Sequence, residues 1–285
     1  MSELSSLIHD LELKSVRYRK SILSMIKHAN SGHTGGSLSC IDILNVLYNH
    51  VLNVDPNSPS DPDRDRYIHS KGHSVEALYV VLADRGFLPA EEIYTFEQYG
   101  SRLIGHPTRK VPGIEQNTGA LGHGLSVAVG MALAAKKDQR NYRVFTLLGD
   151  GELTEGSVWE ACMSASHYQL DNLVVIVDRN GLQITGPTEE VMRLEPLEEK
   201  FRAFGLAVRS VDGNSIPQLL QVFEQIPFEK GKPSLILAFT VKGKGVSFME
   251  SNALWHHRVP NDQEYEQAVE ELEQVETQLS GTRLR

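Results

Sequence analysis

An aspartate and an asparagine follow two apolar segments of the chain, at a spacing that can bring them together. Asp150 lies in a Gly-Asp-Gly turn after the apolar run 142–148, and Asn180 follows closely after the apolar run 173–177. Both runs are typical of buried parallel strands, and residues 157–168 between them have a helical pattern. Because a right-handed crossover places the carboxyl ends of such strands at one edge of a sheet, we expect the two side chains to be neighbours.

These side chains have the chemistry to hold a divalent cation together with a diphosphate. Mg²⁺ prefers hard oxygen ligands and usually keeps water and phosphate oxygens in its shell, and Ca²⁺ or Mn²⁺ could replace it. Asp150 and Asn180 supply such oxygens, and the chain must curl past the ion near Leu182, whose carbonyl is a third candidate ligand. Gly151 lets the backbone approach a phosphate closely. The alternative interpretation of Gly-Asp-Gly is a plain polar turn, which Asp also favours.

Several histidines have an unusual placement in glycine-rich loops instead of on apolar faces: His33, His73, His106, His123 and His256. Together they suggest a polar cleft that handles hydroxyl and phosphate groups. They do not suggest zinc, because none has a cysteine or carboxylate at the close spacing of a zinc site. The histidines without glycine neighbours are interpreted as structural or surface residues: His9, His28, His50, His69 and His167.

Three other charged groups have weaker functional interpretations. Lys242 begins a Lys-Gly-Lys-Gly sequence that lacks the Gly-Lys-Ser/Thr ending of a P-loop, so we interpret it as a solvated turn. Glu152 and Glu155 precede the helix expected at 157–168, where an acid is favourable near the N-terminus. We prefer that interpretation for Glu152. The first strand-to-helix turn has no Gly-x-Gly-x-x-Gly sequence, which argues against nicotinamide binding.

The composition excludes several classes of protein. A net charge of −9 argues against nucleic acid or an anionic membrane as the main partner, although residues 262–276 hold seven acids and no base and are typical of a solvated helix face. No apolar run approaches the roughly 20 residues of a membrane helix, and the N-terminus lacks a secretory signal. Cys40 and Cys162 lie in apolar helical patterns and are expected as buried thiols. We therefore expect a cytoplasmic protein.

The elements that would position these residues alternate between strands and helices. Strands are predicted at 66–69, 142–148, 173–177, 206–211 and 234–239. Helices are predicted at 4–29, 39–48, 75–85, 90–99, 125–136, 157–168, 197–204 and 216–226, with an acidic helix at about 262–280. Polar loops are expected at 30–37, 100–119, 181–190 and 243–260. This alternation predicts one α/β domain over residues 1–285, with a mostly parallel sheet covered by helices on both faces.

Five short signatures resemble transketolase, a family of thiamine-diphosphate enzymes. They are Ser-Gly-His-Thr-Gly-Gly at 31–36, Ser-Lys-Gly-His at 70–73, Gly-His-Pro at 105–107, Thr-Gly-Ala-Leu-Gly-His-Gly at 118–124, and Gly-Asp-Gly at 149–151 followed by Asn180. The last is shared by several classes of thiamine-diphosphate enzyme, whereas the first four are more specific to transketolase. The resemblance extends over residues 11–261 and implies the diphosphate-binding half of such an enzyme.

The resemblance implies how a cofactor would be held. Asp150, Asn180 and the Leu182 carbonyl would bind the metal, and Gly151 and Asn180 the diphosphate of thiamine diphosphate. The other cofactor contacts that it implies are His73, His256, Gly119, Ala120 and Leu121.

It also implies catalytic roles. His33, His106 and His256 would hold sugar hydroxyls and move protons during C–C cleavage, and Glu155 would join a carboxylate network across a subunit interface. Some positions depart from the family's pattern. Ala120 replaces a common proline, and His257 stands where glycine is usual, so access near that site can differ. His69 replaces an aliphatic residue, and we interpret it as structural.

The family also needs a second domain, which binds the aminopyrimidine ring and which we do not find in this sequence. We therefore expect a split transketolase of α2β2 composition, in which a partner chain carries that domain and much of the grip on the sugar phosphate. Such an enzyme would transfer a two-carbon ketol unit from a ketose phosphate to an aldose in carbohydrate metabolism of the pentose phosphate type. Two alternatives remain open: another thiamine-diphosphate enzyme, of the 2-oxo acid or deoxyxylulose-phosphate synthase type, and a non-catalytic cofactor-binding subunit.

Overall fold

A five-stranded parallel sheet forms the centre of the structure, a computed structural model that describes residues 2–282. Its strands are β1 (Arg66–His69), β2 (Val144–Gly149), β3 (Leu173–Arg179), β4 (Ala207–Asp212) and β5 (Ser234–Phe239). They pair in the order β1-β2-β3-β5-β4, with every pair parallel. The predicted α/β fold class is therefore confirmed, and the carboxyl ends of the strands share one edge.

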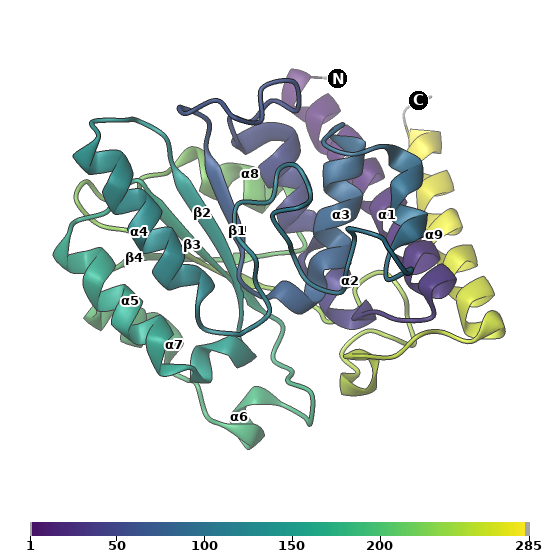
Figure 1. The fold of residues 1–285 in the computed structure, drawn as a ribbon. Helices are drawn as coiled ribbons and strands as arrows, with labels where there is room; N and C mark the ends of the chain where they lie inside the picture. The colour runs from purple at the N-terminus through teal and green to yellow at the C-terminus, as the bar shows by residue number, and fades with distance from the viewer. Residues whose placement is uncertain (1, 283–285) are drawn as a thin grey trace.

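Helices cover both faces of this sheet (Figure 1). One side holds α1 (Glu3–Ala29), α2 (Thr34–Val46), α3 (Val75–Asp84), α8 (Ile216–Glu224) and α9 (Asp262–Thr282). The other holds α4 (Gly124–Lys137), α5 (Gly156–His167) and α7 (Leu197–Ala203). The shorter helices are η1 (Leu47–Val51), η2 (Gly72–Ser74), η3 (Ala90–Thr95), η4 (Gly151–Thr154), α6 (Thr188–Val191) and η5 (Ala253–Trp255).

Alternate residues of the central strands enter the two hydrophobic clusters, as the two-residue period of a strand requires. In β2, Phe145 and Leu147 pack with α1, α2 and α3, whereas Val144 and Leu148 pack with α4 and α5. Both sets are fully buried, which explains why the strand is a continuous apolar run in the sequence.

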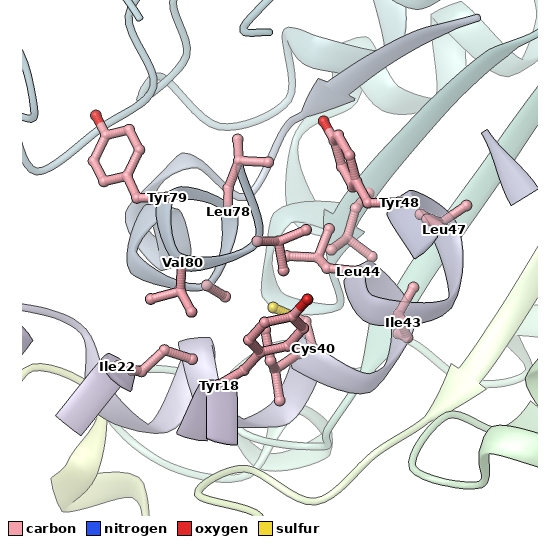
Figure 2. Close-up of a cluster of buried hydrophobic side chains, with 14 of the residues drawn as sticks. Tyr18, Ile22, Cys40, Ile43, Leu44, Leu47, Tyr48, Leu78, Tyr79 and Val80 are labelled. Atoms are coloured by element: carbon pink, nitrogen blue, oxygen red, sulfur yellow. The ribbon is translucent and has the colours of Figure 1, made fainter. Parts of the chain in front are cut away.

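The core between α1, α2 and α3 is built from side chains far apart in the sequence (Figure 2). Tyr18 and Ile22 of α1 lie beside Cys40 of α2 and Val80 of α3. Cys40 and Cys162 are both free and buried, as their apolar patterns predict. Among residues 2–282, none of the helices combines the length and the apolar character needed to cross a bilayer.

Two helix predictions were wrong in their extent. Helix α2 begins at Thr34, so the glycines predicted as loop belong to its first turn. Gly35 allows close packing there, because an added Cβ would lie 2.8 Å from the Trp255 carbonyl oxygen. The helix predicted at 90–99 is only the short η3, and Glu97 beyond it has a φ of 55°. In both places tertiary packing overrides the local pattern.

The acidic helix α9 packs along α1, so its acids are not only a solvated face. Glu276 accepts hydrogen bonds from Arg17 at 2.7 Å and from Lys20 at 3.0 Å, and Asp262 lies 2.6 Å from Lys27. These pairs join helices separated by more than 200 residues. Exposed pairs of this kind contribute roughly 0–1 kcal/mol each, so the buried apolar seam provides most of the attachment.

A buried ion pair between Arg19 of α1 and Asp42 of α2 allows a test of how these two helices are held together. Both Nη atoms of Arg19 donate to the Asp42 carboxylate, at 3.0 and 2.7 Å, and its Nε donates to the Lys244 carbonyl at 2.8 Å. Arg19→Ala leaves Asp42 buried without its cation, so we expect the free energy of unfolding to fall by about 3–5 kcal/mol in urea titrations at pH 7.

The matched control is Arg17→Ala in the same helix, which removes an exposed partner of Glu276 and should cost about 0–1 kcal/mol. Equal losses in the two variants would contradict a stabilising role for the buried pair.

Candidate active site

A cavity of about 460 Å³ opens at the carboxyl edge of the sheet. Asp150, which follows β2, and Asn180, which follows β3, both line it. The Gly181 amide also donates to the Asp150 carboxylate at 2.6 Å. The proximity predicted for these two residues is therefore confirmed. Most of the other predicted site residues, whether for catalysis, cofactor or metal, line the same cavity: His33, His73, Gly119, Leu121, Gly151, Leu182 and His256.

Asp150 is almost fully buried and well supplied with hydrogen-bond donors. Besides Gly181, the Gly151 amide donates to it at 2.8 Å and the Arg179 guanidinium at 3.0 Å. Burial raises the pKa of Asp150, as does the nearby charge of Asp178, while the donors oppose this shift. A cation beside this carboxylate would favour its charged form further.

Arg179 connects the predicted metal carboxylate to the segment that follows β3. Its guanidinium donates to Asp150, to Thr188 Oγ1 at 2.6 Å, to Glu189 at 3.2 Å and to Glu195 at 3.0 Å. These contacts hold residues 181–195 against the site, where Leu182 enters the cavity wall. Arg179 was not among the residues predicted from the sequence, although its place at the carboxyl end of a buried strand was a usable signal.

The oxygen atoms at this edge fit a hard divalent cation that also binds a ligand. Asn180 Oδ1 accepts a local hydrogen bond from the Leu182 amide, at 3.1 Å, and the Leu182 carbonyl lies 3.5 Å from Lys242 Nζ. One carboxylate, one carboxamide and one carbonyl would give three candidate protein ligands. The part of the chain that the structure describes has no cluster of three or more His, Cys, Asp or Glu side chains for a metal. Diphosphate oxygens and water would suit the remaining positions of an octahedral Mg²⁺.

Imidazole rings gather beside these oxygens. The ring centroid of His33 lies 5.3 Å from that of His73, 6.3 Å from that of His106 and 5.6 Å from that of His256. His257 joins them, with its ring 4.5 Å from that of His33. Burial lowers the pKa of His33 to about 4 and that of His256 to about 3, so both rings are neutral near pH 7.

His123, in contrast, does not belong to this group. Its side chain is exposed, and its Nδ1 bonds to the Leu121 carbonyl at 2.9 Å. The expectation that all of the loop histidines form one cleft was therefore wrong for His123. His69, interpreted as structural, is buried and bonds to Tyr67 and Ser74.

The interpretation of Lys242 as a solvated turn was wrong. Its side chain is only 2% exposed and lines the cavity, and its Nζ lies 2.8 Å from His256 Nδ1. Burial, helped by the charge of Lys71, lowers the pKa of Lys242 to about 8. The available signal was position, since Lys242 follows soon after the carboxyl end of β5 and so returns to the same edge.

Glu152 does precede a helix start, as interpreted, but its burial and its role as a hydrogen-bond acceptor were not predicted. It is 2% exposed and accepts hydrogen bonds from Ser70 Oγ, from the Gly122 amide at 2.9 Å and from the Gly149 amide at 3.1 Å. This carboxylate therefore joins three loops at the edge of the sheet. It fixes the loop that carries Gly119 and Leu121, whereas Ala120 and Glu155 are exposed outside the cavity.

A second buried acid, Glu76 of α3, supports the loop that carries His33. It accepts hydrogen bonds from the His33 amide and from Ser37 Oγ, both at 2.7 Å. Burial raises its pKa to about 7. Glu76 was not predicted from the sequence, because an acid in an apolar helix pattern is typical of an exposed position.

The parallel sheet and the donors at its carboxyl edge define an α/β domain of the cofactor-binding kind. The family model described as "Transketolase, thiamine diphosphate binding domain" matches residues 13–273. The chain belongs to the transketolase family.

Some similar proteins match this chain over nearly their whole length, and others match it over about half of theirs. One subunit of an apulose-4-phosphate transketolase from Phocaeicola vulgatus is 49% identical over 278 residues, which are 96% of this chain and 99% of that protein. A 6-deoxy-6-sulfo-D-fructose transketolase subunit of a Clostridium species is 43% identical over 93% of this chain and 96% of its own length. The transketolase structure from Campylobacter jejuni matches with a TM-score of 0.82 and 30% identity, over 95% of this chain and 48% of that one.

Stability should depend on pH through Glu76. Its pKa is raised from 4.5 to about 7 on folding, so the stability it contributes is present below pH 4.5 and lost as the pH rises through 7. We expect Glu76→Gln to gain about 2–3 kcal/mol of unfolding free energy relative to wild type between pH 5 and pH 8, in urea titrations at each pH.

The control is Glu224→Gln, which changes an exposed carboxylate at the end of α8 and should follow the wild-type curve. If the free energy of unfolding changes with pH in the same way in Glu76→Gln and in the wild type, the buried carboxyl is not the source of the pH dependence.

Proposed function

We propose that this chain is the diphosphate-binding subunit of a two-chain transketolase. With thiamine diphosphate and Mg²⁺, which Ca²⁺ or Mn²⁺ could replace, the complete enzyme moves a two-carbon ketol unit from a ketose phosphate to an aldose. The observation that carries the proposal is the single cavity that combines the oxygens of Asp150, Asn180 and Leu182 with neutral imidazoles. Metal–diphosphate binding and sugar handling need these two sets of groups side by side.

In this proposal each side of the cavity has its own task. Asp150, Asn180 and the Leu182 carbonyl hold the metal, and Gly151 and Asn180 hold the diphosphate. Lys242 adds a buried positive charge that the diphosphate would neutralise. The bound cofactor supplies the nucleophilic carbon and the electron sink that C–C cleavage needs.

The histidines handle the protons. A neutral imidazole offers one donor and one acceptor, so it can bind a sugar hydroxyl and take up its proton. Neutral His33 and His256 can bind a hydroxyl, and burial lowers the pKa of His106 as well. His73 borders the diphosphate side, with its ring 5.2 Å from that of His256.

A partner chain completes the proposed enzyme. Relatives that are named as single subunits of a transketolase align over nearly their whole length, which supports a separate chain for the aminopyrimidine-binding domain. The assembly that we propose for the two chains is α2β2. Glu155 is exposed beside the cavity loops, which suits a contact across a subunit interface. The free thiols Cys40 and Cys162 support a reducing compartment, the cytoplasm. The substrates named for the relatives differ, so the donor sugar is best found with a panel of ketose phosphates.

Ketol transfer should require both chains. We expect this chain, purified with a partner that carries the aminopyrimidine-binding domain, to transfer the ketol unit in the presence of thiamine diphosphate and Mg²⁺. Either chain alone should be inactive in the same coupled assay. Pyruvate as donor is the control for a 2-oxo acid enzyme.

A pair that stays inactive with every ketose phosphate would refute the proposed activity. Full activity of this chain alone would refute only its division between two chains.

Cofactor binding should depend on Asp150. We expect Asp150→Ala and the isosteric Asp150→Asn to weaken Mg²⁺-dependent binding of thiamine diphosphate by at least about 100-fold, because a principal metal ligand is lost. Titration of the assembled enzyme by near-UV circular dichroism measures this without turnover.

The control is Asp212→Ala, which removes an exposed aspartate at the carboxyl end of β4, outside the cavity. Unchanged cofactor affinity in both Asp150 variants would rule out the metal role of Asp150.

A further inference from the structure

His257 lies next to the cavity histidines, yet it has no part in holding the metal or the diphosphate. Its side chain is exposed, while the ring of His33 beside it is mostly buried. The two ring centroids are 4.5 Å apart and the planes meet at 66°, so one ring packs edge-on against the other. His257 thus extends the imidazole wall from the cavity toward solvent. Under the proposed function, a sugar held by His33 would pass His257 if it extended out of the cavity.

The backbone around His257 is firmly held. On one side Trp255 is buried, with its carbonyl packed closely against Gly35 of α2. On the other side, Thr34 Oγ1 donates to the Arg258 carbonyl at 2.7 Å. The backbone between two such anchors is held in place, so placing the ring for a hydrogen bond costs less entropy.

The charges nearby favour a neutral partner over a phosphate. The guanidinium of Arg258 is turned to the ring of Trp255, at 4.5 Å, and to Glu264, at 2.5 Å. Lys242 lies deeper, with its Nζ 2.8 Å from His256. With Arg258 and Lys242 both engaged elsewhere, the imidazole of His257 is the polar group that this surface offers, and its ring nitrogens can hydrogen-bond a hydroxyl group.

We propose that His257 is a specificity-determining residue, whose imidazole hydrogen-bonds a hydroxyl on the part of the ketose that extends beyond the transferred two-carbon unit. This inference rests on the proposed transketolase function and deepens it. It predicts a preference for polyhydroxylated donors over donors that carry the ketol unit alone.

The test compares two donors with the assembled enzyme. One is the ketose phosphate that the wild type uses best, and the other is hydroxypyruvate, which carries the same ketol unit but no further hydroxyl-bearing carbon. We expect His257→Ala to lower kcat/KM for the ketose phosphate about 3- to 10-fold, mainly through KM, as the loss of one neutral hydrogen bond implies. The value for hydroxypyruvate and the affinity for thiamine diphosphate should stay within about twofold.

Two further variants sharpen the result. His257→Gln keeps a donor and an acceptor and should recover part of the preference for the ketose phosphate. His50→Ala removes another exposed histidine and should behave as wild type. His50 lies at the opposite edge of the sheet, where the carbonyl of the next residue, Val51, accepts a hydrogen bond from Arg143.

Equal losses with both donors, or a loss of cofactor affinity in His257→Ala, would show a structural role and overturn the inference. If His257→Ala leaves the ratio of the kcat/KM values for the two donors unchanged, the inference is overturned as well. The proposed function stands in either case, as long as the wild type transfers the ketol unit. A wild-type enzyme inactive with both donors refutes the proposed function, and the inference with it.

Discussion

A buried ion pair between Lys71 and Asp178 joins the segments on which the cavity depends. Lys71 follows β1 and Asp178 lies near the end of β3, so their contact spans β2 between them. Both are almost completely inaccessible, and removing two charges from water costs several kcal/mol unless each is fully hydrogen-bonded. Lys71 also donates to the Gly36 carbonyl at 3.0 Å, and Asp178 accepts from Ser39 Oγ at 2.7 Å and from Thr240. Burial would raise the pKa of Asp178, but the charge of Lys71 holds it below its usual range.

This pair fixes candidate site residues because they are its neighbours in the chain. Asn180 lies two positions after Asp178, and His73 lies two positions after Lys71. The bond to Gly36 holds the first turn of α2, directly after His33. Loops that start from one rigid contact can keep their side chains in place without a ligand, and that precision is what binding and catalysis require.

The sequence predicted the features that depend on the pattern of nearby residues. It predicted less well the features that depend on packing between distant segments. The strands and the adjacency of Asp150 and Asn180 follow from periodicity and crossover geometry, which need no knowledge of other segments. The burial of Glu152 and Lys242 was not predicted, because the residues that bury them come from distant loops. The start of α2 was displaced for the same reason, since glycine is a poor helix former until close packing favours it.

The charges in the cavity explain why a metal and a diphosphate would depend on each other. Lys242 is buried beside His256 and the Leu182 carbonyl, and burial together with the charge of Lys71 lowers its pKa. For Asp150 the negative form is the unfavourable one. Burial and the charge of Asp178 raise its pKa, although Arg179 opposes this shift. A divalent cation alone would relieve Asp150 but repel Lys242, and a diphosphate alone would do the reverse. A metal–diphosphate unit presents each group with the opposite charge, so both are stabilised only when the two ligands are bound together.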